Sequence, residues 1–445
     1  MYDLFLRQPF MSTAGVAACD AGAIVAAMCR FELALARVEE EAGHLPAGSA
    51  DAIASHIQAD AFDISDLAAG TADGGNVAIV FVKQAKALLP QPLKQALHKG
   101  ATSQDVVDTA LMLVLKPRLA HCLQQLGDAI DGGTTLMDAH ARTPMIGRTL
   151  TQQALPITFG AKVAQWLAGL MQAETRLADV VARGLYVQFG GPVGTHHGLA
   201  DDGMTLMAAL ADELDLACPL LPWHTDRQPI LALLDAVGAV AVAAEKIATD
   251  IAFMAQTEVG EASEPAATGA GGSSSMPHKQ NPVGSTRIRA AARQIHAAVG
   301  LVHTTAAQVH ERAFGEWHAE WAPTVDAVLL LEGALETLVP LITDLQVDPQ
   351  AMRTNLARTG GANLAAPAVA LLAEVMDREH AQALAARASD RARRDGLDFA
   401  DALLDIPEIA EAIDGAHLRA AVDPGAYVGT SAAQIARIHA ALEQS

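Results

Sequence analysis

A chain of 445 residues with a formal charge of −21 is longer than a usual single domain and too acidic for a general nucleic-acid or anionic-membrane surface. Hydrophobic residues make up 51% of the chain but aromatic residues only 4%, and the abundance of Ala and Leu favours helices over sheets. The composition therefore predicts an all-α protein with few strands, in which an anionic substrate would need a locally basic pocket.

The four cysteines, Cys19, Cys29, Cys122 and Cys218, are scattered without the spacing of a zinc site or a disulfide framework. The N-terminus lacks a basic start followed by an apolar run and a cleavage site. The most apolar stretch, residues 230–244, is shorter than a membrane span needs. We therefore expect a cytoplasmic protein without a transmembrane segment.

Apolar residues recur at helical spacing along most of the chain. In chain order, this pattern predicts helices over residues 20–42, 76–89, 105–141, from 157 onward, 229–258 and 286–312, then a break at 345–349 before shorter helices. Pro117 predicts a bend within one of them. The helix over 229–258 is apolar on every side in its first half, so it must be enclosed, which predicts a multi-subunit helical bundle.

Residues 266–275 are rich in Gly, Ala and Ser and run directly into Met276-Pro277-His278-Lys279-Gln280-Asn281-Pro282. Composition alone fits a flexible linker. Two prolines that bracket Lys279 and Asn281 favour instead a loop that closes over an anion and is then held still.

The string GSSSMPHKQNP, residues 272–282, resembles the signature loop GSSxMPxKxNP of the fumarase/aspartase superfamily at every fixed position. The resemblance implies a homotetramer around a long-helix bundle, with each active site assembled from segments of three subunits. It also implies that Ser273 is the catalytic residue and that Ser274, Lys279 and Asn281 bind substrate.

The chemistry that this loop implies is proton transfer at a carbon next to a carboxylate. Such a reaction needs a base on one face and fixed positive charge and hydrogen-bond donors on the carboxylate. Serine is a poor base unless backbone N–H groups and Lys279 stabilise the alkoxide, or unless Ser273 acts mainly as the proton donor. His278 is either a solvated loop residue or a further carboxylate contact.

A second segment, His98-Lys99-Gly100-Ala101-Thr102-Ser103-Gln104-Asp105, precedes a long helix. Thr102 and Asp105 have capping-box spacing, and an ordinary helix start is the simpler interpretation. A helix start also offers free N–H groups to an anion. The segment resembles HxGxTSxD of the same superfamily, which implies that His98, Thr102 and Ser103 bind substrate.

A third segment, residues 147–156, resembles the superfamily's GRTHxQxAxP, which implies that Arg148, Thr149 and Gln152 bind substrate. Leu150 departs from the pattern, because adenylosuccinate lyase, argininosuccinate lyase and fumarase carry a histidine there. Leucine cannot protonate a leaving group. The departure therefore favours a leaving group that departs as a stable anion, such as a carboxylate.

Residues 190–197 and 310–321 resemble, within the superfamily, the 3-carboxy-cis,cis-muconate cycloisomerases. This likeness implies lactone chemistry on a small polycarboxylate without a cofactor, with Arg312 as a further substrate contact. The alternatives are another lyase of the superfamily, such as adenylosuccinate lyase, and a catalytically silent structural homologue. Nucleic-acid and membrane partners are not expected.

Three helical regions are expected along the chain: an N-terminal domain over 1–103, a central long-helix bundle over 104–345 that carries the signature loop, and a C-terminal domain over 346–445.

Neighbouring His196 and His197 point in different directions in most backbones, which disfavours a metal site. Trp317 and Trp321, four residues apart on a helix, are expected to pack.

Overall fold

The computed structural model describes residues 3–199, 201–265, 276 and 279–444. Contacts divide the chain into two compact units, each built from separated segments. Unit 1 comprises Met1–Gly127, Gln172–Glu245 and Arg287–Thr337, and unit 2 comprises Asp128–Met171, Lys246–Thr286 and Leu338–Ser445. The division into three regions along the sequence stays a prediction.

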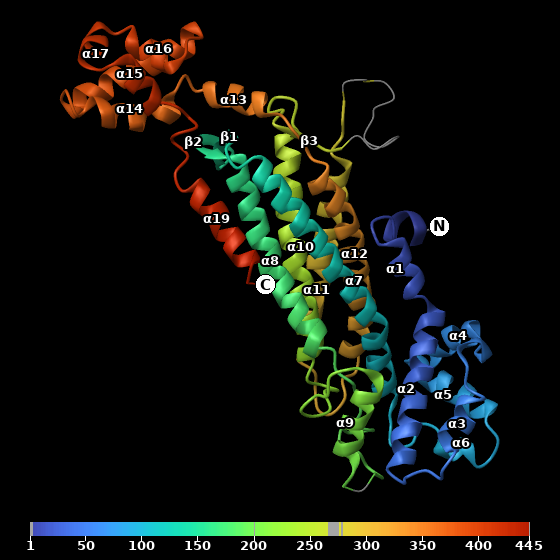
Figure 1. Ribbon diagram of the computed structural model, residues 1–445. Helices are drawn as coiled ribbons and strands as arrows, with labels where there is room; N and C mark the ends of the chain where they lie inside the picture. Colours follow the sequence, from blue (N-terminus) through green and yellow to red (C-terminus); the bar gives the residue numbers. More distant parts are fainter. Residues whose placement is uncertain (1–2, 200, 266–275, 277–278, 445) are drawn as a thin grey trace. The chain divides into compact units, whose positions relative to one another are not determined.

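Helices account for most of the regular structure in the described residues, which confirms the all-α class (Figure 1). The five longest are α7 (Ser103–Ala139), α8 (Phe159–Arg183), α10 (Gln228–Met254), α11 (Val283–Thr305) and α12 (Glu316–Thr343). Four of the five were expected as helical segments, although α11 ends before residue 312, and α12 was not among the predicted ranges. Pro117 lies inside α7 without interrupting it. In the described part of the chain, no helix is long and apolar enough to cross a membrane.

The N-terminal elements of unit 1 are short apart from α2, and they end at α6 (Figure 1). They are a π-helical turn (Asp3–Arg7), α1 (Thr13–Ala18), α2 (Ala21–Glu41), α3 (Ser49–Ala54), a 3-10 turn (Ala59–Ala61), α4 (Ile64–Gly74), α5 (Val77–Leu88) and α6 (Leu93–Ala96), with α9 (Gly203–Leu214) later in the chain. Asp20 begins α2 by accepting a hydrogen bond from the N–H of Ala23 at 2.8 Å. The buried face of α2 carries Phe31 and Leu35 but also Glu32 and Glu39.

Unit 2 contains a β-hairpin that the sequence analysis did not predict. Strands β1 (Pro144–Thr149) and β2 (Gln152–Thr158) pair antiparallel, with a register shift between Ile146 and Arg148. Leu150 and Thr151 join them, both in the left-handed region at φ 50° and 65°. This tight turn places the segment that resembles GRTHxQxAxP at the tip of a hairpin.

The C-terminal part of unit 2 has its own apolar core, in which Leu372, Leu403 and Leu418 are fully buried. Its elements are β3 (Ala262–Ser263) paired with β4 (Gln346–Val347), α13 (Pro349–Ala357), a 3-10 turn (Ala362–Leu364), α14 (Ala365–Leu372), α15 (Arg378–Asp395), α16 (Phe399–Leu404), α17 (Pro407–Ala412), α18 (Gly415–Ala421) and α19 (Ser431–Leu442). The expected break at 345–349 therefore contains a short strand before the shorter helices.

Candidate active site

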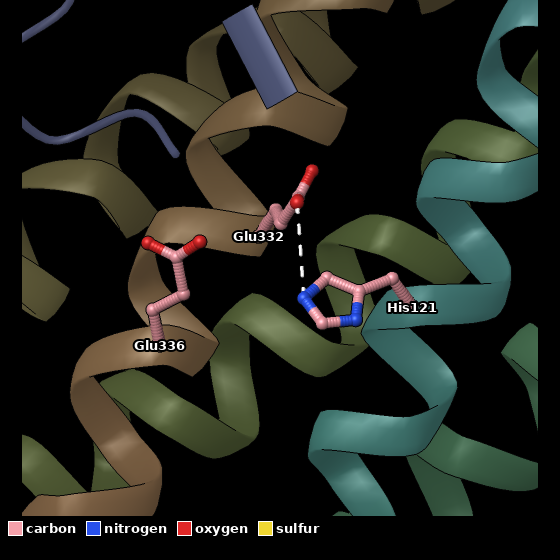
Figure 2. Close-up of side chains that lie close together, drawn as sticks. All are labelled: His121, Glu332 and Glu336. Carbon is pink, nitrogen blue, oxygen red and sulfur yellow. Dashed lines mark ion pairs between the residues drawn. The ribbon is translucent and has the colours of Figure 1, made fainter. Parts of the chain in front are cut away.

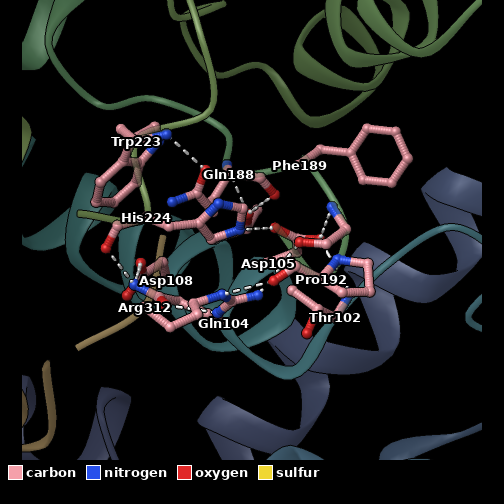
Figure 3. Close-up of polar contacts among 12 residues, drawn as sticks. Thr102, Gln104, Asp105, Asp108, Gln188, Phe189, Pro192, Trp223, His224 and Arg312 are labelled. Carbon is pink, nitrogen blue, oxygen red and sulfur yellow. Dashed lines mark hydrogen bonds and ion pairs between the residues drawn. The ribbon is translucent and has the colours of Figure 1, made fainter. Parts of the chain in front are cut away.

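Asp105, in the first turn of α7, organises the polar region at the start of that helix (Figure 3). Its side chain is fully buried, and its Oδ2 accepts hydrogen bonds from the N–H groups of Thr102 at 2.9 Å and Gly191 at 3.0 Å. Its Oδ1 lies 2.6 Å from Nε2 of His224. The bond to Thr102 is one of the two bonds of the predicted capping box, and the other two contacts of Asp105 tie the helix start to residues far along the chain.

Arg312 connects the same helix start to the segment around Pro192 (Figure 3). Its guanidinium donates to the Gln104 Oε1 at 2.6 Å and to the carbonyl oxygens of Gly191 and Pro192, each at 3.2 Å. Burial lowers the pKa of Arg312, although an arginine stays charged at any physiological pH. Three of its five N–H groups are thus engaged within the chain, and the other two have no partner among the described residues, while its role as a substrate contact stays a prediction.

His98, Thr102 and Ser103 lie together at this end of α7, all of them partly buried. Nδ1 of His98 lies 2.7 Å from Oε1 of the buried Glu32. The hydroxyls of Thr102 and Ser103 make no hydrogen bond to another described residue. Unit 1 therefore groups two open hydroxyls, an imidazole and a guanidinium, the donors that a carboxylate would need.

A buried ion-pair network around Arg227 lies next to the polar region at the start of α7. Arg227 donates to Asp108 at 2.8 Å and to Glu320 at 3.1 Å, and its guanidinium carbon lies 4.5 Å from the centre of the Trp223 ring. The indole N–H of Trp317 donates to Asp108 at 2.8 Å. Burial raises the pKa of Glu320 to about 7 despite the neighbouring arginine. Trp317 thus has a structural role, as its packing interpretation predicted.

The candidates of the third segment lie in unit 2, on the hairpin. Arg148 forms a bidentate ion pair with Glu261, at 2.8 and 2.7 Å. Glu261 is fully buried and also accepts from Asn355 Nδ2 at 2.8 Å. Thr149 and Gln152, at the hairpin tip, are exposed. The structure thus commits Arg148 to a buried carboxylate and leaves its role as a substrate ligand a prediction.

Leu150 stands at the tip of the hairpin with 95% of its side chain exposed. An apolar side chain at a left-handed turn is unusual, because turns of this kind favour Gly, Asn or Asp. Neither packing within the single chain nor the geometry of the turn explains a leucine at this position.

The signature loop is only partly described. Ser273, Ser274 and His278 lie outside the described residues, so their predicted roles are not addressed by the structure. Lys279 and Asn281 are described and exposed, just before α11. The carboxylate of Glu264 accepts from the N–H groups of Gly284 and Ser285, each at 2.8 Å, and so occupies the start of that helix.

A cavity of about 600 Å³ in unit 2 has lining residues different from these candidates. Leu155, Lys162, Trp166 and Asp250 line it, and Asp250 accepts from the Trp166 indole at 2.8 Å. Burial lowers the pKa of Lys162, which lies 3.7 Å from Asp250. Leu155 and Pro156 of the third segment thus line the cavity, but none of the residues that the three motifs assign to the substrate does.

One group of described side chains has the proximity that a metal ion would need. Ligand atoms of His121, Glu332 and Glu336 all lie within 4.8 Å of one another (Figure 2). Glu332 is fully buried, and its Oε1 accepts from Arg118 at 3.2 Å and from the Ser12 hydroxyl at 3.1 Å. Because Arg118 already supplies a positive charge, the cluster is explained as an ion-pair network.

The chain is similar to known proteins over nearly its whole length. The family model described as Lyase matches residues 12–297. A 3-carboxy-cis,cis-muconate cycloisomerase of Bradyrhizobium diazoefficiens is 38% identical over 99% of this chain and 98% of its own. A nitrosuccinate lyase of Streptomyces davaonensis is 37% identical over 93% of this chain and 90% of its own. The crystal structure of a 3-carboxy-cis,cis-muconate lactonizing enzyme from Pseudomonas putida matches with a TM-score of 0.92 and 33% identity over 99% of both chains.

The protein belongs to the fumarase/aspartase superfamily of lyases. The family-level prediction and the fold that it implied are therefore confirmed. Of this superfamily member's candidate residues, unit 1 holds His98, Thr102, Ser103 and Arg312, while unit 2 holds Arg148, Thr149, Gln152, Lys279 and Asn281.

The sequence analysis did not predict the residues that position these candidate side chains. His224 lies 119 residues from Asp105, and Glu261 lies 113 residues from Arg148, so no local pattern links them. Glu32 did leave a signal, because it lies on the apolar face of a predicted helix, seven residues before Glu39. A charged residue on a buried face needs a partner.

Proposed function

We propose that the protein is a 3-carboxy-cis,cis-muconate cycloisomerase. It would catalyse the reversible lactonisation of 3-carboxy-cis,cis-muconate to 4-carboxymuconolactone, in protocatechuate degradation by the beta-ketoadipate pathway. The observation that carries the proposal against a lyase such as adenylosuccinate lyase is Leu150, because a site without a proton donor at that position suits a leaving group that departs as an anion, such as a carboxylate. The near full-length likeness to cycloisomerases supports it.

In the lactonising direction, one substrate carboxylate oxygen adds to the conjugated alkene and forms the ring C–O bond. The electron pair of the alkene moves toward the activating carboxylate, where Lys279, Asn281, Thr102 and Ser103 would stabilise the developing negative charge. Ser273 would then deliver a proton to the adjacent carbon. All electrons stay within the substrate, so the reaction requires no redox cofactor.

The active site would be assembled from several copies of the chain in a homotetramer. Exposed apolar side chains support this assembly, since Leu150, Val242 and Phe253 are 95%, 58% and 51% exposed in the single chain. We expect this tetramer to act in the cytoplasm on a small polycarboxylate, without nucleic-acid or membrane partners.

Subunit complementation tests the shared site. Ser103→Ala would disable a residue of unit 1 and Ser273→Ala a residue of the signature loop. If sites draw on different subunits, unfolding and refolding the two inactive variants together should restore activity, because some mixed sites contain neither substitution. Refolding each variant alone is the control. Mixed tetramers that remain as inactive as their parents would contradict shared sites.

A substrate panel tests the reaction itself. Purified protein should remove the ultraviolet absorbance of 3-carboxy-cis,cis-muconate and show little turnover of muconate, fumarate, argininosuccinate or adenylosuccinate. Cleavage of adenylosuccinate without turnover of carboxymuconate would show that the chain is another lyase of the superfamily. No turnover of any compound would favour the structural homologue.

Nitrosuccinate is the second substrate that the comparisons favour. The Streptomyces davaonensis relative named for it is almost as similar as the cycloisomerases. A nitrite leaving group would depart as an anion, so Leu150 suits this reaction equally well. The panel must therefore include nitrosuccinate, and release of nitrite in place of lactone formation would overturn the cycloisomerase proposal.

A further inference from the structure

Helix α2 buries a carboxylate beneath the His98 segment. Glu32 is 1% exposed and lies on a helix face whose neighbours Met28, Phe31 and Leu35 are apolar and at most 1% exposed. An ionised carboxylate in such surroundings is costly unless a cation or several donors pair with it. Its position therefore calls for a specific partner.

That partner is His98. Oε1 of Glu32 lies 2.7 Å from His98 Nδ1, while Oε2 makes no hydrogen bond in the described structure. His98 itself has φ 62°, a left-handed conformation that is uncommon for residues other than glycine, although histidine adopts it more often than most. The backbone thus takes an unfavourable conformation at the residue whose ring meets the buried acid.

The remaining edge of the imidazole is open. The His98 side chain retains 15% of its exposure, and its Nε2 has no hydrogen-bond partner among the described residues. His98 stands four residues before Thr102, whose hydroxyl is also open. One ring nitrogen is thus fixed by the protein, and the other is available to a ligand.

The charged groups around His98 come from three helices. Burial by itself would lower the pKa of His98, but the charge and hydrogen bond of Glu32 outweigh it. Asp105 of α7 also raises that pKa, and Lys86 of α5 opposes the rise. The net result is a His98 pKa above its ordinary value, which favours the imidazolium.

The second buried acid of α2 does not compete with Glu32 for this role. Burial raises the pKa of Glu39 to about 8, with only partial opposition from Lys99. Glu39 is therefore mostly neutral at pH 7. Its two carboxyl oxygens have no hydrogen-bond partner in the described structure, so Glu32 is the anion that His98 meets on α2.

We propose that Glu32 is a positioning residue that holds His98 as an imidazolium, with Nδ1–H donated to Glu32 and Nε2–H directed at a substrate carboxylate. The charge state matters because a neutral ring that donates through Nδ1 would present a lone pair at Nε2. That lone pair would repel a carboxylate. The substrate part of the inference rests on the proposed function, but the Glu32–His98 relation does not.

Deuterium exchange at the C2 position of each histidine, read by peptide mass spectrometry, reports the titration midpoint of His98 in the intact protein. In the wild type, the midpoint should lie above the ordinary value. Glu32→Gln preserves the shape and an acceptor but removes the charge, so the midpoint should fall by about one pH unit, a tenfold loss of proton affinity. The matched control Glu39→Gln should leave it unchanged below pH 7. An unmoved midpoint in Glu32→Gln would overturn the inference.

Glu32→Asp provides a second variant in case the glutamine variant does not fold. It keeps the charge at a longer distance from Nδ1, so the midpoint should fall by a smaller amount. A midpoint identical to the wild type in a folded Glu32→Asp protein would count equally against the inference.

Kinetics add the functional readout. The KM for 3-carboxy-cis,cis-muconate should rise with pH above the His98 midpoint, and Glu32→Gln should shift that profile to lower pH with kcat changed only a few-fold. A purely structural role for Glu32 would change activity without shifting the profile, and that result would refute the proposal. If the wild type does not turn over this compound, the proposed function fails while the exchange measurement still decides the role of Glu32.

Discussion

The start of α7 in unit 1 and the β1–β2 hairpin in unit 2 carry candidate residues for the same substrate, yet the protein holds them in opposite ways. At the start of α7, Asp105 binds two backbone N–H groups and His224, and its carboxylate is fully buried. At the hairpin tip, Thr149 and Gln152 are exposed and Leu150 is 95% exposed.

This difference indicates which half of the proposed site is complete within one chain. Unit 1 offers a preorganised set of donors whose supporting groups are already paired, as a binding site for an anion requires. On the hairpin, Arg148 is paired with Glu261, but the side chains of the tip are exposed in the single chain. We infer that the tip acquires its environment only when another copy of the chain covers it.

The largest effect is expected at Ser273 in the signature loop, which would act on the same substrate as both regions. Ser273→Ala should lower turnover of the natural substrate by about a thousandfold or more, because the proton-transfer group is removed. Initial rates from lactone formation would measure this effect. Ser275→Ala, two residues away at a variable position of the motif, is the matched control and should stay within a few-fold. A Ser273→Ala enzyme that retains near wild-type turnover would refute the catalytic assignment.

The candidate residues at the start of α7 should be sensitive to loss of the Asp105 carboxylate. Asp105→Asn removes the charge that pairs with His224 and replaces one acceptor oxygen with a donor, so we expect about 3 kcal/mol of destabilisation. Activity should fall with it, since Thr102 and Gly191 lose a shared anchor. Thermal unfolding and initial rates would measure both. Asp128→Asn, on an exposed position of the same helix, should change neither. Wild-type stability in Asp105→Asn would contradict the described geometry.

The two regions also differ in how far sequence could predict them. Helical periodicity and capping spacing are local, so α7 and the Thr102–Asp105 interaction were predictable and are confirmed. The hairpin was missed, because residues 144–158 lack the alternation of apolar residues that marks a strand. The Arg148–Glu261 pair, which fixes the hairpin to a buried carboxylate, joins residues that are distant in sequence.

The candidate site shows the same difference between residues that a local pattern predicts and residues that it does not. Motif residues such as His98 were identified by resemblance, but the partner that would set its charge, Glu32, lies 66 residues away. Long-range pairing depends on packing, and a pattern of single residues does not encode it. A buried charge on an apolar helix face was the available signal, and it indicated that a partner exists without indicating which one.

A smaller effect is expected at the exposed turn. Leu150→Ala should change turnover only a few-fold if the leaving group departs unprotonated, since leucine supplies no proton. Gln152→Ala, in the same hairpin, should lower turnover about tenfold or more by removing a substrate hydrogen bond. Steady-state kinetics of the two variants would give the comparison. A larger loss in Leu150→Ala than in Gln152→Ala would contradict this account and would indicate that the leucine contacts the reacting substrate.

The smallest effect concerns stability alone and lies in unit 1, in the buried face of α2. Burial raises the pKa of Glu39 from 4.5 to about 8, so the folded protein retains a proton that the unfolded chain releases. Below pH 4.5 both states are protonated and the carboxyl imposes no pH-dependent penalty. As pH rises toward 8, only the unfolded state ionises, and stability is lost progressively.

Glu39→Gln cannot ionise, so it should remove that pH dependence. The melting temperature of the variant relative to the wild type should rise by a few degrees between pH 5 and pH 8, whatever constant offset the buried amide introduces. Differential scanning fluorimetry across this range would measure it. Glu41→Gln, an exposed position at the end of the same helix, should show a constant difference from the wild type. If the difference between Glu39→Gln and the wild type is equally independent of pH, Glu39 is ionised in the folded protein. Helix α2 would then bury two charged carboxylates, Glu32 and Glu39, rather than one.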